Sequence, residues 1–332
     1  MIKKLLYLFS FLVFNISSFA QQKKKKPLCN PLIIGNLPKK QWSLQGELQS
    51  GFKNSYTEYR IPNNIKGNNT YDGVPSLRAS FYKPIITKPK SYVTFEAGYW
   101  LSSFYGKNLN SVITNQPQGN DVFTLYSVTA ATTIFKPIDD KHFILINASV
   151  EANGNAAAFT KLSGQNILVG GAAIYGWKKS YNQMTGIGIL RAYRLGKLIH
   201  VPAFLWNKNF NKKWGVEALL PARATFRYAA NKKTFAVAGF DLEGTQYLYT
   251  RTLPLQFNTF VQRGEVKTKV GLDTELSKRV RLTAQMGARF MARFNWSSDK
   301  KGNELVIENN AKPNLYANVG LHLMPKPKAK KK

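Results

Sequence analysis

Charged residues recur at alternate positions in several segments of this chain. Between residues 280 and 294, Arg281, Arg289 and Arg293 alternate with apolar side chains. On a β-strand, this spacing places the arginines on one face and the apolar residues on the other. A row of guanidinium groups can attract anionic solutes or neutralise carboxylates that lie opposite it. The chemistry therefore depends on which other charges share the face of these arginines.

The same alternation in other segments assigns a nearly balanced set of charges to one common interior face. The predicted set comprises Arg78, Arg223, Arg227, Lys267, Lys269, Arg281, Arg289 and Arg293, together with Glu47, Glu96, Glu151, Glu217, Asp273 and Glu275. One interpretation is a network of ion pairs that fills the interior, because unpaired buried charges are costly. The other is an anion-selective or solute-binding pore, with Arg281, Arg289 and Arg293 as a basic ladder.

Catalytic and metal-binding groups have weaker support. The three histidines, His142, His200 and His322, are isolated in the sequence and lack metal-ligand spacing. A hydrolase in a barrel would need Ser and His on neighbouring strands, and only His322 is expected on the charged face. We therefore expect no enzymatic activity, no metal and no cofactor, with a barrel hydrolase as a remote alternative.

Long strands must position these charges. Every second residue from Val280 to Phe294 is apolar. A strand in a soluble protein has about 5–6 residues, whereas about 9–11 residues cross a bilayer. The apolar face of such a strand could contact either a protein core or lipid.

Alternation and turn residues predict about fourteen strands between residues 41 and 324. Regular strands are centred near residues 47, 79, 97, 147, 226, 271, 287 and 319, and less regular ones fit 121–135, 166–177, 183–193, 198–206, 213–219 and 233–240. Merging the two short strands near Leu219–Pro221 would leave twelve. The predicted fold is all-β, a transmembrane antiparallel up-and-down barrel of 12–14 strands; two soluble sandwiches are the rival.

The N-terminus indicates secretion. Lys3 and Lys4 precede the apolar stretch Leu5–Phe14, and Ser18–Ala20 resembles a signal-peptidase site. Ten apolar residues are too few for a transmembrane anchor. We therefore predict cleavage near Ala20, a basic periplasmic lead over 21–40 and an outer-membrane location. Cys29, the only cysteine, cannot form an internal disulfide and has no predicted role.

The connections between strands suggest two different ends of the barrel. Ser277–Arg279 and Asn231–Lys233 are expected as short turns, whereas Asn54–Val74 and Trp296–Pro313 are expected as long loops. In bacterial barrels the short turns face the periplasm and the long loops face outward.

Most of the net charge of +31 falls in the predicted short turns and the two tails, including the C-terminal tail 325–332. This predicted basic rim contains Lys23, Lys24, Lys25, Lys26, Lys136, Lys178, Lys179, Lys212, Lys213, Lys232, Lys233 and Lys330. It could bind an anionic surface such as lipid head groups, peptidoglycan carboxylates or an acidic periplasmic protein. Alternatively, the lysines only keep strand ends from aggregating. A secretory signal makes nucleic acid an improbable partner, and we expect a monomer in outer-membrane lipid.

Several short segments carry a resemblance to known proteins. With Phe210–Trp214 (FNKKW), Ala218–Pro221 (ALLP), Phe226–Asn231 (FRYAAN) and its last three strands, the chain resembles an uncharacterised outer-membrane β-barrel family of Bacteroidota, a domain of unknown function. The resemblance covers Trp42–Met324. It implies a barrel in the outer membrane and brings no activity with it. The chain departs from such barrels in ending its last strand at Leu323-Met324 rather than on a terminal aromatic residue.

These observations lead to two main hypotheses for function. The first is a passive channel or transporter for small, possibly anionic, solutes. The second is a structural or envelope-interaction barrel whose interior is closed by ion pairs and whose basic rim contacts a partner.

Overall fold

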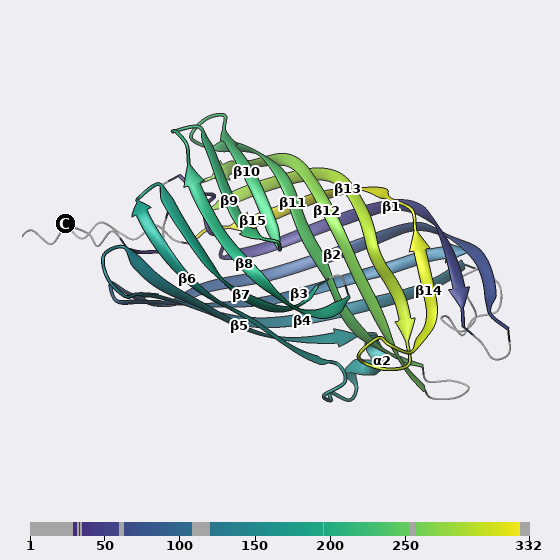
Figure 1. Ribbon diagram of the computed structural model, residues 1–332. Coiled ribbons are helices and arrows are strands. Elements are labelled where there is room, and N and C mark those ends of the chain that lie inside the picture. Colours follow the sequence, from purple (N-terminus) through teal and green to yellow (C-terminus); the bar gives the residue numbers. More distant parts are fainter. Residues whose placement is uncertain are drawn as a thin grey trace, which may run out of the picture.

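The computed structural model describes residues 29–31, 33, 35–59, 63–107, 120–194, 196–251 and 257–325. In this part of the chain the strands form one closed barrel (Figure 1). The predicted signal peptide, Lys23–Lys26 and Lys330 lie outside the described residues. No helix in the described ranges is long and apolar enough to cross a membrane.

From β2 to β14 each strand pairs antiparallel with the strand before it, and β15 pairs antiparallel with β13 and β1. The elements are β1 (Trp42–Glu58), β2 (Ile65–Lys88), β3 (Ser91–Lys107), β4 (Asn120–Pro137), β5 (His142–Gly154), α2 (Ala156–Phe159), β6 (Ile167–Ser180), β7 (Gln183–Arg194), β8 (Lys197–Asn209), β9 (Trp214–Leu220), β10 (Arg223–Ala229), β11 (Thr234–Arg251), β12 (Phe257–Ser277), β13 (Val280–Ser297), β14 (Leu305–Ala311) and β15 (Asn314–Leu323).

The barrel closes between β13 and β1. Both β14 and β15 lie between these two strands, so they are two parts of one last strand, interrupted at Lys312 and Pro313. The result is a 14-strand barrel, as the alternation predicted. The twelve-strand alternative is wrong, because β9 and β10 form a separate hairpin on either side of Pro221.

The outward face of the barrel is apolar. Burial alternates strictly along β15, and Met286 on β13 is 62% exposed. Other large outward side chains of this apolar belt are Leu44, Leu48, Val270, Leu272, Leu315, Val319 and Leu321. Because alternate residues point to opposite faces of a strand, the polar residues between them point into the barrel interior, which we call the lumen.

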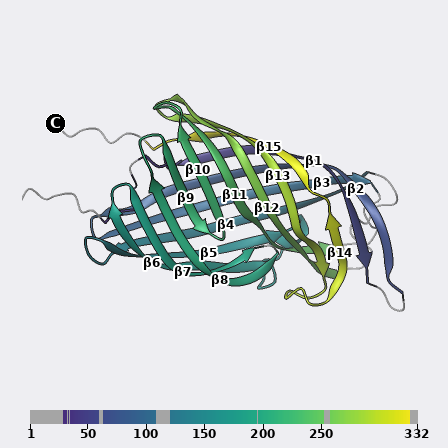
Figure 2. The same cartoon turned by 45° about the horizontal axis from the view of Figure 1, so that its top comes forward.

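The two ends of the barrel differ. At the terminal end, where β1 begins and β15 ends, short turns such as Ser277–Val280 join the strands. At the opposite, far end, Asn54–Val74 and Trp296–Pro313 were expected as loops, and this was wrong. Most of Asn54–Val74 belongs to β1 and β2, and β14 lies inside Trp296–Pro313 (Figure 2). The far-end parts of β1 and β2 are stabilised because their inward aromatic residues pack together. Phe52 and Tyr71, for example, stack with ring centroids 4.6 Å apart.

Fewer strands form the barrel wall toward the far end. Strands β6–β10 are short, and beyond them β5 meets β11 directly through a parallel pairing of Gly154 with Leu248 (Figure 1). The short helix α2 covers this seam, because Ala158 packs against Leu248 and Phe260. Gly154 permits the close approach: a Cβ there would lie 2.6 Å from the Cβ of Ala158 and 2.7 Å from the carbonyl oxygen of Leu248.

We expect Gly154→Val to destabilise the barrel by about 1–3 kcal/mol, because the added side chain would force β5 and β11 apart. The matched control is Gly46→Val on β1, where a Cβ meets no atom within 4 Å. Thermal unfolding of both variants in detergent, followed by the heat-dependent shift in electrophoretic mobility, measures the difference. Equal melting temperatures would show that the seam carries no strain.

Candidate functional site

The predicted arginine ladder lies on β13, and the alternation of inward and outward side chains shifts by one residue along this strand. On β12, Gly264 pairs with Arg293 whereas the next residue, Glu265, pairs with Met291. Ala292 is therefore the extra residue of a β-bulge, and the side chains beyond it exchange faces. Arg281 and Arg289 point into the lumen as predicted.

Two predictions beyond this bulge were wrong. Phe294, expected on the lipid face, is 1% exposed and packs in the lumen. Arg293, expected in the lumen, lies on the opposite face and donates from Nη1 to Gln262 Oε1 at 3.3 Å. The predicted ladder is therefore reduced to Arg281 and Arg289.

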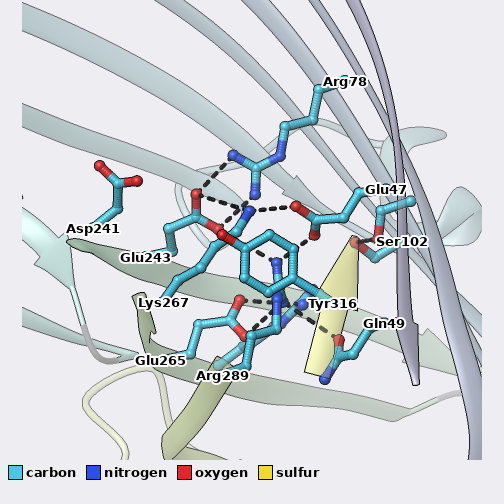
Figure 3. A network of polar contacts seen from close by, with 12 residues as sticks. Glu47, Gln49, Arg78, Ser102, Asp241, Glu243, Glu265, Lys267, Arg289 and Tyr316 are labelled. Carbon is cyan, nitrogen blue, oxygen red and sulfur yellow. Dashed lines mark hydrogen bonds and ion pairs between the residues drawn. The ribbon is translucent and has the colours of Figure 1, made fainter. Parts of the chain in front are cut away.

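Arg289 is the centre of a buried charge network (Figure 3). Its side chain is 0% exposed, and its Nη1 donates to Glu265 Oε2 at 2.6 Å and to Gln49 Oε1 at 3.3 Å. Its Nη2 donates to Glu47 and lies 3.6 Å from Glu243 Oε2. Because such charges are costly to bury singly, the arginine and its carboxylates must be kept together.

Two further cations complete the contacts of these carboxylates. Lys267 forms an ion pair with Glu47 and lies 3.9 Å from Glu243. Arg78 on β2 holds Glu243 on β11 through two hydrogen bonds of 2.8 and 2.6 Å, the bidentate geometry that suits guanidinium and carboxylate. This last pair joins strands on facing walls, so the network crosses the lumen.

Two carboxylates of the network were missed by the sequence analysis. Glu243 lies on β11, which was expected to end at residue 240, and Glu265 lies at the start of a segment whose alternation was followed only from Val266. Extending the same period by a few residues in each strand would have placed both on the charged face. The alternation that identifies both carboxylates is present in the sequence, but the predicted strands were too short to include them.

Aromatic side chains fill the lumen on the far-end side of the charge network. Phe104 on β3 and Phe294 on β13 stack with centroids 5.3 Å apart, and Phe123 on β4 lies 5.8 Å from Trp296. This aromatic cluster also includes Phe52, Tyr71, Val74, Leu125, Tyr247, Val261, Ile307 and Ala311. Side chains from strands that are not neighbours in the sheet are therefore in contact across the lumen at this level.

On the terminal-end side, further predicted charges form separate pairs. Arg281 Nε donates to Asp273 Oδ1 at 2.5 Å, and Lys40 lies 2.8 Å from the second oxygen of the same carboxylate. Arg281 also lies 3.7 Å from Glu275. Arg227 and Glu217 are 3.9 Å apart. The pairing therefore supports the interpretation of this face as ion-paired.

Other predicted lumen residues lie apart from the charge network. Glu151 accepts hydrogen bonds from Asn153 and Thr245, while Glu96 and Arg223 are exposed. Lys269 pairs with Asp241 at 2.6 Å. These groups were placed on the inward face from the period alone, and the structure does not bring them to the centre.

His322 on β15 is a buried residue that pairs with Arg281 on β13. His322 Nε2 lies 2.7 Å from Thr283 Oγ1, and both side chains are buried. Within the described ranges, no group of three or more His, Cys, Asp or Glu side chains is arranged to hold a metal ion.

The lead segment enters the terminal end of the lumen. Cys29 and Ile33 pack against Phe135, Phe143 and other inward side chains, and the backbone N–H of Leu37 donates to Glu217 at 2.9 Å. The sequence analysis predicted residues 21–40 as a basic periplasmic lead and did not foresee that Cys29, Ile33 and Leu37 contact the barrel interior. The segment lacks periodicity, so only its contacts with the barrel reveal its place.

The basic rim keeps most of its described members. Six lysines are exposed at the turns of the terminal end: Lys136, Lys179, Lys212, Lys213, Lys232 and Lys233. Lys178 was wrongly assigned to this surface. It is 0% exposed, and its Nζ donates to the carbonyl oxygen of Asn30 at 2.7 Å, which anchors the lead inside the barrel.

The reactivity of the Cys29 thiol depends on this anchoring and can be used to test it. Burial raises the pKa of the Cys29 thiol, so the reactive thiolate is scarce at neutral pH. We expect Cys29 in the folded protein to react with a maleimide at least tenfold more slowly than in the unfolded chain, and Lys178→Ala to accelerate the reaction. Mass spectrometry of the labelled protein measures the rate. The control is Lys179→Ala, the exposed neighbour; an equal acceleration there would contradict anchoring by Lys178.

The model of the family described as a domain of unknown function (DUF6268) matches residues 97–324. No curated protein matches the chain. Three similar solved structures are an outer-membrane channel of Pseudomonas putida F1 (11% identity, 89% and 100% of the two chains covered, TM-score 0.39), the toluene transporter TodX of P. putida (11%, 88% and 91%, 0.36) and the outer-membrane protease OmpT of Escherichia coli (8%, 85% and 96%, 0.32).

Proposed function

The chain belongs to the DUF6268 family, and from this premise we propose that it is an outer-membrane β-barrel protein whose lumen is closed in its resting state. The family match confirms the resemblance to a family without an assigned activity, while its restriction to Bacteroidota stays a prediction. The proposal favours the second of the two functional hypotheses and retains the expectation that the chain is not an enzyme.

The apolar belt supports the membrane location. Leu48, Val270 and Met286 are outward residues of three strands, each more than half exposed, and a surface of this kind needs lipid or a partner to cover it. Strand lengths of 10–24 residues for β1–β8, β11–β13 and β15 suffice to cross a bilayer. With a signal peptide cleaved near Ala20, the terminal end would face the periplasm.

A single observation carries the proposal of a closed lumen. Charged and aromatic side chains from facing walls contact one another, as Arg78 with Glu243 and Phe104 with Phe294 do. A solute that crosses this level must displace an ion-pair network whose central members, Arg289, Glu47 and Glu265, are buried, which is costly. Passage of small solutes, including the anionic ones first considered, would therefore require a conformational change.

Conductance across planar lipid bilayers tests this function. We expect the wild-type protein, shown to be folded by heat-modifiable migration, to insert without a steady current. A steady anion-biased current from the same preparation would overturn the closed resting state and support the passive channel. A general porin inserted under identical conditions controls for the sensitivity of the measurement.

The exposed lysines at the terminal end support a second role for the barrel, that of binding an anionic surface such as peptidoglycan. Each lysine near such a surface contributes about 1 kcal/mol at most, and less at high salt. We expect a variant with Lys212, Lys213, Lys232 and Lys233 changed to Ala to be recovered less on peptidoglycan at low salt. The control changes Lys66 and Lys301, exposed near the far end. Equal recovery of both variants at low and high salt would contradict this role.

A further inference from the structure

Arg263 on β12 is a buried guanidinium group that the ion pairs only partly satisfy. It is 0% exposed, and its carbon lies 4.9 Å from the ring centroid of Trp100 and 5.1 Å from that of Phe104. Its Nη2 lies 3.2 Å from Glu265 Oε1. Among the described residues, however, its Nε, Nη1 and Nη2 find no hydrogen-bond partner. Guanidinium is a donor of five hydrogen bonds, and the adjacent Glu265 Oε1, itself without a hydrogen-bond partner among the described residues, could accept at most part of them.

Two other side chains of the lumen also have no hydrogen-bond partner in the described part of the chain. The indole Nε1 of Trp100 and the hydroxyl of Tyr71 are buried and, in the described part of the chain, have no hydrogen-bond partner. Tyr71 lies against Phe104, one of the two rings that contact Arg263. Buried donors without acceptors cost free energy, so their concentration at one level of the lumen requires an explanation.

The charges at this level are also unbalanced. Four basic side chains are linked by ion pairs of 4 Å or less to three carboxylates: Arg78, Arg263, Lys267 and Arg289 to Glu47, Glu243 and Glu265. Among the described residues Glu151 forms no ion pair of 4 Å or less with these cations, and it accepts hydrogen bonds from Asn153 and from Thr245, the residue paired with Arg263 between β11 and β12. One positive charge is therefore in excess within the connected network. A buried anion would neutralise this charge and supply the missing acceptors.

We propose that Arg263, Trp100 and Tyr71 form a binding site for the carboxylate of a small amphipathic acid, whose apolar body enters between the rings of the aromatic cluster when these rings separate. The guanidinium carbon lies over the rings of Trp100 and Phe104, and a bidentate carboxylate would contact its Nε and Nη1, which have no hydrogen-bond partner among the described residues. Phe104 and Phe294 supply flat apolar surfaces next to this position. The inference goes beyond a closed lumen, and it is tested by equilibrium binding rather than by conductance.

Isothermal titration of the purified full-length barrel in detergent tests the class of ligand. Benzoate is the probe, benzamide keeps its ring without the charge, and inorganic phosphate keeps a charge without the ring. We expect benzoate to bind saturably, and we expect benzamide and phosphate to bind at least about tenfold more weakly than benzoate. Benzamide that binds as tightly as benzoate would overturn the role of the charge, and phosphate that does so would overturn the role of the apolar body.

Substitutions test the site itself. We expect Arg263→Gln to weaken benzoate binding at least tenfold, whereas Arg293→Gln, on the other face of the neighbouring strand, leaves it unchanged. Arg263→Lys keeps the charge and should retain part of the affinity. Equal benzoate affinity in the Arg263→Gln variant would refute the site.

A stability measurement without ligand separates binding from a structural role. Arg263→Met removes the excess charge and leaves Glu265 paired with Arg289 at 2.6 Å. We therefore expect its melting temperature to equal or exceed that of the wild type, because groups kept for binding are often not optimal for stability. A lower melting temperature together with unchanged benzoate binding in Arg263→Gln would assign Arg263 to the structure alone.

Discussion

Replacing Phe294 by Ala will destabilise the barrel by about 3–5 kcal/mol, whereas Phe290→Ala on the same strand will have a much smaller effect. Phe294 contacts the rings of Tyr71, Phe104 and Phe123, so its removal leaves a cavity in a packed interior. Phe290 is 45% exposed on the outer face, where lipid can fill the space. The two residues lie four positions apart, so regular alternation would give them one environment.

The comparison tests the bulge at Ala292 directly. Equilibrium unfolding by urea of both variants in lipid vesicles, followed by tryptophan fluorescence, gives the two free energies. A similar loss for both phenylalanines would mean that β13 keeps a single phase and that the aromatic cluster does not hold the lumen closed.

Replacing Arg289 by Met will also cost about 3–5 kcal/mol, because its removal leaves Glu47 and Glu265 in the lumen without their principal partner. Arg293→Met is the matched control, since that side chain lies outside the lumen and makes a single hydrogen bond of 3.3 Å to Gln262. We expect the control to change the stability by less than about 1 kcal/mol.

A triple variant separates the loss of pairing from the loss of packing. Arg289→Met combined with Glu47→Gln and Glu265→Gln removes the uncompensated charges and should recover much of the stability. The heat-dependent mobility shift in detergent measures all variants on one scale. If the triple variant is as unstable as Arg289→Met alone, the ion pairs do not account for the effect.

The period of two predicted much of this protein correctly. It identified an all-β barrel and its fourteen strands, because half of each strand must be apolar to face lipid and half polar to face the lumen. It also placed Glu47, Asp273, Arg281 and Arg289 on the inner face, where the structure has them. These results depend only on local geometry, which each segment of sequence carries by itself.

Pairing between strands decided the rest. The bulge at Ala292 arises because two residues of β13 oppose one residue of β12, and no pattern within β13 reveals it. For the same reason Arg293 and Phe294 were placed on the wrong faces. The far-end extensions of β1 and β2 likewise depend on packing across the lumen, which a scan of one segment cannot detect.

Outside the bulge at Ala292, the sequence by itself determined which side chains of β13 face the lumen, because the direction of a side chain in a regular strand depends on its position within that strand. Only the tertiary structure decided which charges meet, since Arg78 and Glu243 lie on strands far apart in the chain and are joined by closure of the barrel. Closure also brought the lead segment against Lys178 and left Arg263 without a hydrogen-bond partner among the described residues. These contacts follow from the register and curvature of all strands together, and so no single segment encodes them.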